Sequence, residues 1–107
     1  MKVGGENVDP AEVEGFLLTH PAISEVQIVG VPDERLSEVV CACIVPKAGH
    51  AVTNNDLSEF CRGKLASFKM PRHTVALDEF PMTASGKPQK AKIRTIATEH
   101  IGLNQTR

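Results

Sequence analysis

A glycine followed by a lysine, Gly86-Lys87, ends a proline-containing segment just before a helical pattern near the C-terminus. A lysine ammonium is a compact point charge that suits a phosphate or carboxylate oxygen. The phosphate-binding P-loop pattern would need glycine at position 81 and serine or threonine at position 88, and both positions are proline. Lys87 therefore does not belong to a P-loop. Locally it is a candidate for phosphate or carboxylate chemistry, or an ordinary solvated loop lysine.

Two further polar segments could bind a ligand. The segment Gly4-Gly5-Glu6-Asn7 has adjacent glycines, which allow positive φ angles or a close approach of the backbone to a ligand. A plain turn before a helix would explain it equally well. In the basic stretch Lys87, Lys90, Lys92 and Arg94, Lys90 and Arg94 are four residues apart and share a helix face. They could contact nucleotide phosphates or form a solvated face.

Hydrophobic periodicity and turn residues define the elements that must position these segments. We expect a helix from Pro10 that ends at His20-Pro21, strands at about 23–31 and 38–46, a helix after Thr53 that includes Leu65, a strand at 74–77 and a helix at about 89–101. Asp9 should be the N-cap of the first helix, with Glu12 completing a capping box, and Gly102 should stop the last helix.

The second strand is apolar at nearly every position, which is typical of a central strand covered on both faces. Cys41 and Cys43 should point to the same face of it as buried, reduced thiols. The order of elements predicts an α+β fold: a small two-layer domain with a sheet of about three strands and helices packed on it. Such a domain has no deep pocket of its own, so an enzyme site would need a second domain.

Composition excludes several functional classes. The 107 residues carry a formal net charge of −1, contain no Trp or Tyr and only four Phe, and so favour no nucleic-acid partner. We find no residues spaced as metal ligands, no transmembrane segment and no signal peptide. These features indicate a cytoplasmic location.

Four segments, in order, resemble the C-terminal domain of the adenylate-forming (AMP-dependent synthetase and ligase) superfamily, which includes acyl-CoA and aryl-CoA ligases, peptide-synthetase adenylation domains and beetle luciferases. They are the glycine loop with the helix after it (Gly4 to Glu14), Val31-Pro32-Asp33 with Glu38, Phe68 to Pro71, and Pro81 to Lys87 with Lys90 and Arg94. The residues of these motifs are most like those of fatty acyl-CoA synthetases. Two positions depart from the family, which often has an aromatic residue at Asp9 and glycine at Ser37.

The resemblance implies that residues 1–107 form the mobile C-terminal lid domain of an ATP-dependent acyl-CoA synthetase. Such an enzyme activates a carboxylic acid, here a fatty acid, as an acyl-adenylate and then forms the coenzyme A thioester. ATP, Mg²⁺ and the acyl group would be held by a large N-terminal domain that this chain lacks, and the hinge residue would precede Met1. We therefore expect the isolated chain to be inactive, and its acyl specificity cannot be read here.

The resemblance also implies roles for individual residues. Lys87 would be the catalytic lysine of adenylation. Gly4, Gly5, Glu6 and Asn7 would form the coenzyme A (pantetheine) channel, and Lys69, Lys90 and Arg94 are candidate contacts for the phosphates of ATP or coenzyme A. The alternatives are a peptide-synthetase adenylation domain or aryl-CoA ligase, a free-standing nucleotide- or RNA-binding module, and a domain whose charged face docks a partner.

Overall fold

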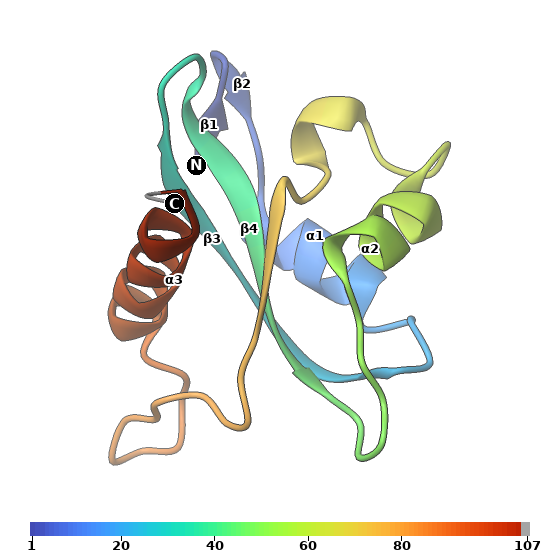
Figure 1. Cartoon of the computed structure of the whole chain (residues 1–107), viewed down its shortest axis with the longest axis vertical. Helices are drawn as coiled ribbons and strands as arrows, with labels where there is room; N and C mark the ends of the chain where they lie inside the picture. Colours follow the sequence, from blue (N-terminus) through green and yellow to red (C-terminus); the bar gives the residue numbers. More distant parts are fainter. Residues whose placement is uncertain (106–107) are drawn as a thin grey trace.

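A three-stranded sheet runs through the centre of the molecule, with helices on both of its faces (Figure 1). The computed structural model describes residues 1–105, and side chains up to residue 102. The elements are β1 (Lys2–Val3), β2 (Glu6–Asn7), α1 (Pro10–Leu17), β3 (Ile23–Asp33), β4 (Ser37–Pro46), α2 (Asn54–Cys61), a 3₁₀ helix η1 (Ser67–Lys69), β5 (His73–Ala76) and α3 (Lys90–Gln105). The α+β class and the three-stranded sheet are confirmed.

Strand β4 lies at the centre of the sheet, in the order β3-β4-β5. It pairs antiparallel with β3 and parallel with β5. Cys41 and Cys43 lie on one face and are fully buried, as predicted. The adjacent Cys43 thiol and burial raise the pKa of Cys41, and burial raises that of Cys61. Both of these thiols therefore stay protonated near neutral pH and are core residues rather than nucleophiles.

Two hydrophobic clusters cover the two faces of the sheet. The first joins the sheet to α1 and α2 through residues such as Val13, Leu17, Ile28, Val40 and Leu57. The second joins it to α3 through residues such as Val39, Cys41, Val75, Phe80 and Ile93. Helices thus lie on both faces, one layer more than the sequence analysis expected, because the continuous apolar run of β4 needs cover on each side.

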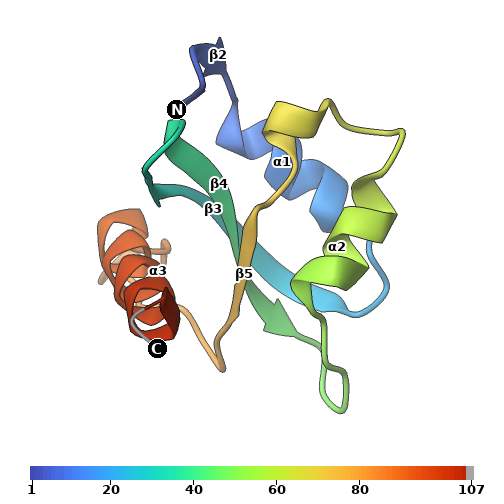
Figure 2. The same cartoon turned by 45° about the horizontal axis from the view of Figure 1, so that its top comes forward.

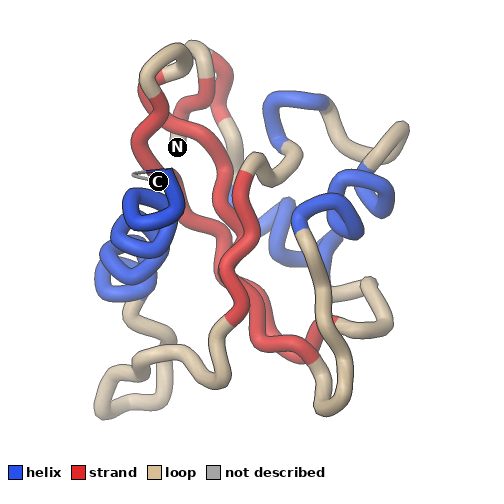
Figure 3. The backbone as a smooth tube through the Cα atoms, in the orientation of Figure 1, coloured by secondary structure: helices blue, strands red, loops and turns tan. Residues whose placement is uncertain are grey.

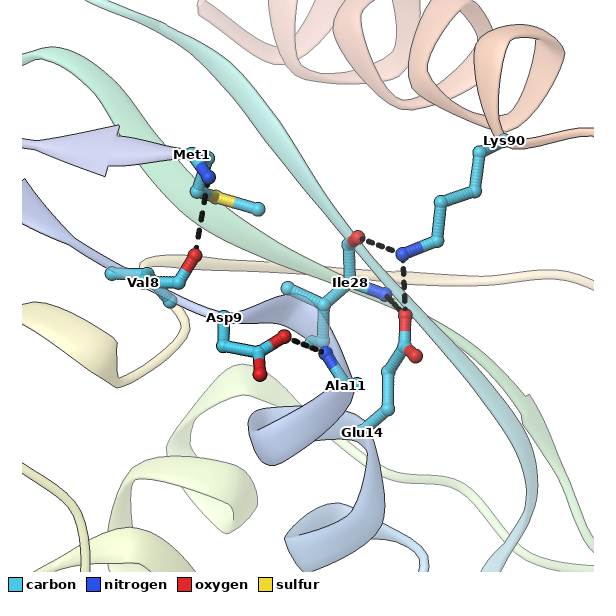
Figure 4. Close-up of polar contacts among 7 residues, drawn as sticks. All are labelled: Met1, Val8, Asp9, Ala11, Glu14, Ile28 and Lys90. Carbon is cyan, nitrogen blue, oxygen red and sulfur yellow. Dashed lines mark hydrogen bonds and ion pairs between the residues drawn. The ribbon is translucent and has the colours of Figure 1, made fainter.

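Asp9 and Thr53 are the N-caps of α1 and α2 as predicted, but one predicted capping box is absent. The Asp9 carboxylate accepts a hydrogen bond from the Ala11 N–H at 3.0 Å (Figure 4). Its predicted partner Glu12 does not complete a capping box and instead pairs with Lys69. In α2 the full capping box is present between Thr53 and Asp56.

Two helix ends differ from the predictions. Helix α2 ends at Cys61, and Gly63 then takes a φ of +77°, so Leu65 packs on the core from a loop rather than from the helix. Helix α3 continues past Gly102 to Gln105, so the predicted stop is wrong. Gly102 is not among the residues with positive φ, which a C-cap glycine adopts. Glycine permits this conformation without requiring it.

Ser37, the first residue of β4 after the turn from β3, is the one described non-glycine residue with positive φ, at +68°. A side chain is strained in this region of φ, which glycine adopts freely. The Asp33 carboxylate accepts hydrogen bonds from the N–H groups of Leu36 and Arg35, which lower its pKa. Over the described residues, none of the helices is both long and apolar enough to cross a membrane.

Candidate functional site

Lys87 lies at the end of a tight hairpin, which we call the lysine hairpin (residues 82–88), within the long loop that Figure 3 shows between β5 and α3. Met82 and Pro88 form an antiparallel bridge at its base. The Thr83 N–H donates to the Lys87 carbonyl at 2.7 Å, and the Lys87 N–H donates to the Thr83 hydroxyl at 3.1 Å. Gly86, with a φ of +86°, makes the reversal possible. The Lys87 backbone is therefore held from both sides by Thr83.

The Lys87 side chain is exposed, and its ammonium forms no ion pair with a carboxylate of the described residues. The hairpin is attached to the body before and after its turn. On one side Phe80 is buried in the core cluster beneath α3. On the other, the chain passes directly into α3, where the Ile93 N–H donates to the Gln89 carbonyl at 3.0 Å. The structure thus presents a cation with no partner of its own on an anchored support.

Strands β1 and β2 form a second hairpin, the glycine hairpin (residues 2–7), which turns at Gly4 and Gly5 with φ angles of +56° and +88°. A Cβ atom at Gly4 would come within 3.2 Å of the Leu36 side chain, whereas one at Gly5 would meet nothing within 4 Å. The Val8 N–H and carbonyl both bond to Met1, which closes the base of the hairpin (Figure 4). The predicted turn is therefore a β-hairpin closed by hydrogen bonds, with an exposed tip at Gly4 and Gly5.

A cavity of about 200 Å³ lies beside the glycine hairpin. Its lining residues are Val3, Gly4, Glu6, Leu36, Ser67, Phe68 and Arg72. Of the four residues predicted to form the pantetheine channel, Gly4 and Glu6 line this cavity, whereas Gly5 and Asn7 do not. Arg72, a cation at this cavity, was missed by the sequence analysis although it directly follows the motif Phe68 to Pro71.

The three predicted phosphate contacts all have partners inside the domain. The Lys69 ammonium lies 3.0 Å from Glu12, and that of Lys90 lies 2.7 Å from Glu14. The Arg94 side chain donates to the Gly30 carbonyl at 2.6 Å. A phosphate would have to share or replace these partners.

The two hairpins lie far apart. In Figure 1 the glycine hairpin is at the top of the view and the loop before α3 is at the bottom, and in Figure 2 strand β2 again lies at the top, away from α3. The structure therefore does not bring Lys87 and the glycines into a single site. Among the described residues, no group of three or more His, Cys, Asp or Glu side chains is arranged to hold a metal ion.

Comparison with known proteins assigns the chain to a family. The family model of the AMP-binding enzyme C-terminal domain matches residues 12–87. The mouse mitochondrial medium-chain acyl-CoA ligase ACSF2 is 48% identical over 100 residues, which are 94% of this chain and 16% of the ligase. The putative acyl-CoA synthetase YngI of Bacillus subtilis is 46% identical over 103 residues, 96% of this chain and 19% of YngI.

Solved structures agree with the sequence relatives. A Mycobacterium tuberculosis fatty acyl CoA synthetase matches 94% of this chain and 20% of its own, with a TM-score of 0.83 and 31% identity. Apo MatB from Rhodopseudomonas palustris matches 90% of this chain and 19% of its own, with a TM-score of 0.85 and 32% identity. The chain thus spans less than a fifth of the length of the two sequence relatives. It belongs to the family of AMP-binding enzyme C-terminal domains, within the adenylate-forming superfamily.

Proposed function

We propose that this chain is the mobile C-terminal domain of an ATP-dependent acyl-CoA synthetase and that Lys87 is its catalytic residue. The observation that carries the proposal is the exposed Lys87 ammonium, which lacks an ion-pair partner among the described residues and stands on a hairpin anchored to the core. The 46–48% identity to acyl-CoA ligases and synthetases supports the same activity for the complete protein.

In the first half-reaction a carboxylate attacks the α-phosphate of ATP, giving an acyl-adenylate and pyrophosphate. Two negatively charged groups must approach each other, and a lysine between them offsets their repulsion and stabilises the transition state. The fixed backbone of Lys87 also orients the two reactants. ATP and Mg²⁺ would be bound mainly by the preceding domain.

In the second half-reaction the thiol of coenzyme A attacks the acyl-adenylate and AMP leaves. We assign the glycine hairpin, with Gly4, Gly5, Glu6 and Asn7, to the channel for the pantetheine arm, because a backbone without side chains leaves room there. Arg72, at the neighbouring cavity, is a further candidate for a phosphate of coenzyme A. Since the two hairpins lie at opposite ends, this domain would have to rotate between the half-reactions (Figure 2).

The substrate is proposed to be a fatty acid. The vertebrate relatives are named medium-chain acyl-CoA ligases and are mitochondrial. Acyl specificity would reside in the preceding domain. A cytoplasmic location remains our prediction for this protein.

The test is Lys87→Ala in the complete enzyme. We expect adenylation, measured as acid-dependent exchange of pyrophosphate into ATP, to fall by about a hundredfold or more, the equivalent of roughly 3 kcal/mol. Thioester formation from supplied acyl-adenylate should be retained. Lys92→Ala is the matched control, because Lys92 is an exposed lysine on the following helix. Equal loss of both half-reactions in Lys87→Ala would contradict the assignment.

A further inference from the structure

The outer edge of β3 has no neighbouring strand, yet its backbone groups at Ile28 are not open to water. Ile28 is fully buried, so its outward N–H and carbonyl need partners from the protein. The N–H donates to the Glu14 carboxylate at 2.8 Å, and the carbonyl accepts from the Lys90 ammonium at 3.0 Å. Lys90 and Glu14 are themselves 2.7 Å apart (Figure 4). We call Glu14, Ile28 and Lys90 the edge clasp.

The edge clasp joins two helices that lie on opposite faces of the sheet. Glu14 comes from α1 and Lys90 is the first residue of α3 (Figures 1 and 4). The Glu14 side chain is 18% exposed and that of Lys90 is 43% exposed, so the ion pair is shielded from solvent on the Glu14 side only. The first turn of α3 is thereby fixed to α1 and to the edge of β3.

Arg94 extends this connection by one helical turn. Its guanidinium donates to the Gly30 carbonyl and lies 3.6 Å from Glu38. A Cβ atom at Gly30 would lie 2.3 Å from the Glu38 side chain, so glycine at this position leaves room for the carboxylate. The Ile28 and Gly30 carbonyls of β3 thus bind two cations that lie one helical turn apart on α3, Lys90 and Arg94.

This arrangement bears directly on Lys87, which lies three residues before Lys90. Residues 82–87 are all exposed, so the lysine hairpin has no packing of its own against the body. Its supports are Phe80, buried on one side, and the start of α3 on the other. The hydrophobic residues that hold α3 begin only at Ile93, so Lys90 is the first side chain after the hairpin that fixes its direction.

We propose that Glu14 and Lys90 are positioning residues that orient the lysine hairpin for adenylation through their shared bonds to Ile28. This inference rests on the proposed function of Lys87. It assigns Lys90 to a support role instead of the phosphate contact that the sequence suggested, because its ammonium already contacts a carboxylate and a carbonyl.

The experiment uses the complete enzyme with Glu14→Ala, Lys90→Met and the double variant. Each single change should lower kcat for adenylation by roughly 10- to 100-fold, since a small displacement of a catalytic group has effects of this size. KM for ATP should not change, and thioester formation from supplied acyl-adenylate should be retained. The double variant should be no slower than the slower single variant, because each single change already breaks the connection between Glu14, Ile28 and Lys90. Glu14→Gln, which keeps an acceptor for the Ile28 N–H, should lose less than Glu14→Ala.

Four results would overturn the inference. A raised KM for ATP or coenzyme A in Lys90→Met but not in Glu14→Ala would make Lys90 a phosphate contact. Equal loss of both half-reactions would indicate a general loss of folded domain. Unchanged adenylation in the clasp variants, beside a slow Lys87→Ala enzyme, would overturn the clasp alone. Normal adenylation in Lys87→Ala would instead overturn the proposed function, and the clasp inference with it.

Exchanging the two charges tests whether the bonds to Ile28 are needed or whether the attraction between Glu14 and Lys90 is enough. The double variant Glu14→Lys, Lys90→Glu restores opposite charges, but a lysine cannot accept from the Ile28 N–H and a glutamate carboxylate cannot donate to its carbonyl. We expect adenylation to stay slow in this variant. Full recovery would overturn the assignment, because it would show that the attraction alone suffices.

Discussion

The glycine hairpin and the lysine hairpin reverse the chain in similar ways but are supported differently. Each has a glycine with nearly the same conformation, Gly5 at +88° and Gly86 at +86°, and neither position would crowd a Cβ atom. The glycine hairpin rests on the core through the buried Val3 and Val8. Residues 82–87 of the lysine hairpin are all exposed, so this hairpin depends on its own hydrogen bonds and its two attachments.

This difference matches the role that we propose for each hairpin. A backbone that lines a channel contributes by its shape, and contact with the core keeps that shape constant. A catalytic ammonium contributes by its charge, and it must project away from the body into another domain. Support for Lys87 therefore has to come from the two ends of its hairpin. The three predictions below test this contrast.

The largest effect is expected at the buried attachment of the lysine hairpin. Phe80→Ala should lower the free energy of unfolding of the 107-residue chain by about 3–5 kcal/mol, because it leaves a cavity under α3. Denaturant titration would measure it. Met82→Ala is the control within the same hairpin, and as Met82 is 45% exposed its effect should stay within about 0.5 kcal/mol. Similar losses for the two variants would mean that Phe80 is not an anchor.

A matched pair of glycine substitutions compares the two hairpins directly. Gly5→Ala and Gly86→Ala should each cost about 1–2 kcal/mol of unfolding free energy, because both force a side chain into the left-handed region. In the complete enzyme Gly5→Ala should slow thioester formation, whereas Gly86→Ala should slow adenylation. Gly15→Ala, in helix α1, is the control and should stabilise the chain by up to about 1 kcal/mol. If both hairpin variants slowed the same half-reaction, the two hairpins would not serve different half-reactions.

The smallest effect is expected at Ser37, whose positive φ glycine would adopt without strain. Ser37→Gly should raise the free energy of unfolding by about 0.5–1 kcal/mol, since relief of strain at +68° exceeds the added entropy of the unfolded chain. Thermal or denaturant unfolding would detect the gain. Ser58→Gly, within α2, should change stability in the opposite direction. A loss of stability in Ser37→Gly would show that positive φ costs little in the turns of this domain.

Local sequence signals predicted most of the fold. The unbroken apolar run identified β4 as the central strand, and Asp9 and Thr53 marked the two helix starts correctly. The exposed loop position of Lys87 was also predicted. These features depend on neighbouring residues, which a single sequence displays. The helix ends at Cys61 and Gln105 were missed because glycine near a helix end permits a stop without imposing one.

The partners of the charged residues could not be predicted. Lys90 finds Glu14 76 positions away, Lys69 finds Glu12 57 positions away, and Arg94 finds Gly30 64 positions away. Such pairs depend on which strand edge and which helix face meet, and no local pattern states this. Arg72 was overlooked for the same reason, since only the fold shows that it and the glycine hairpin share a cavity.

The charged side chains along β3 have a consequence for association as well. An open strand edge is a template on which another chain can add a strand, and natural proteins block such edges with charged groups. Here Lys90 and Arg94 occupy two of the outward carbonyls of β3, those of Ile28 and Gly30, and the opposite edge of the sheet, β5, is only four residues long. Both edges of the sheet therefore offer little surface on which a wrong β-pairing could begin, which would suit the rotation against a second domain that we propose.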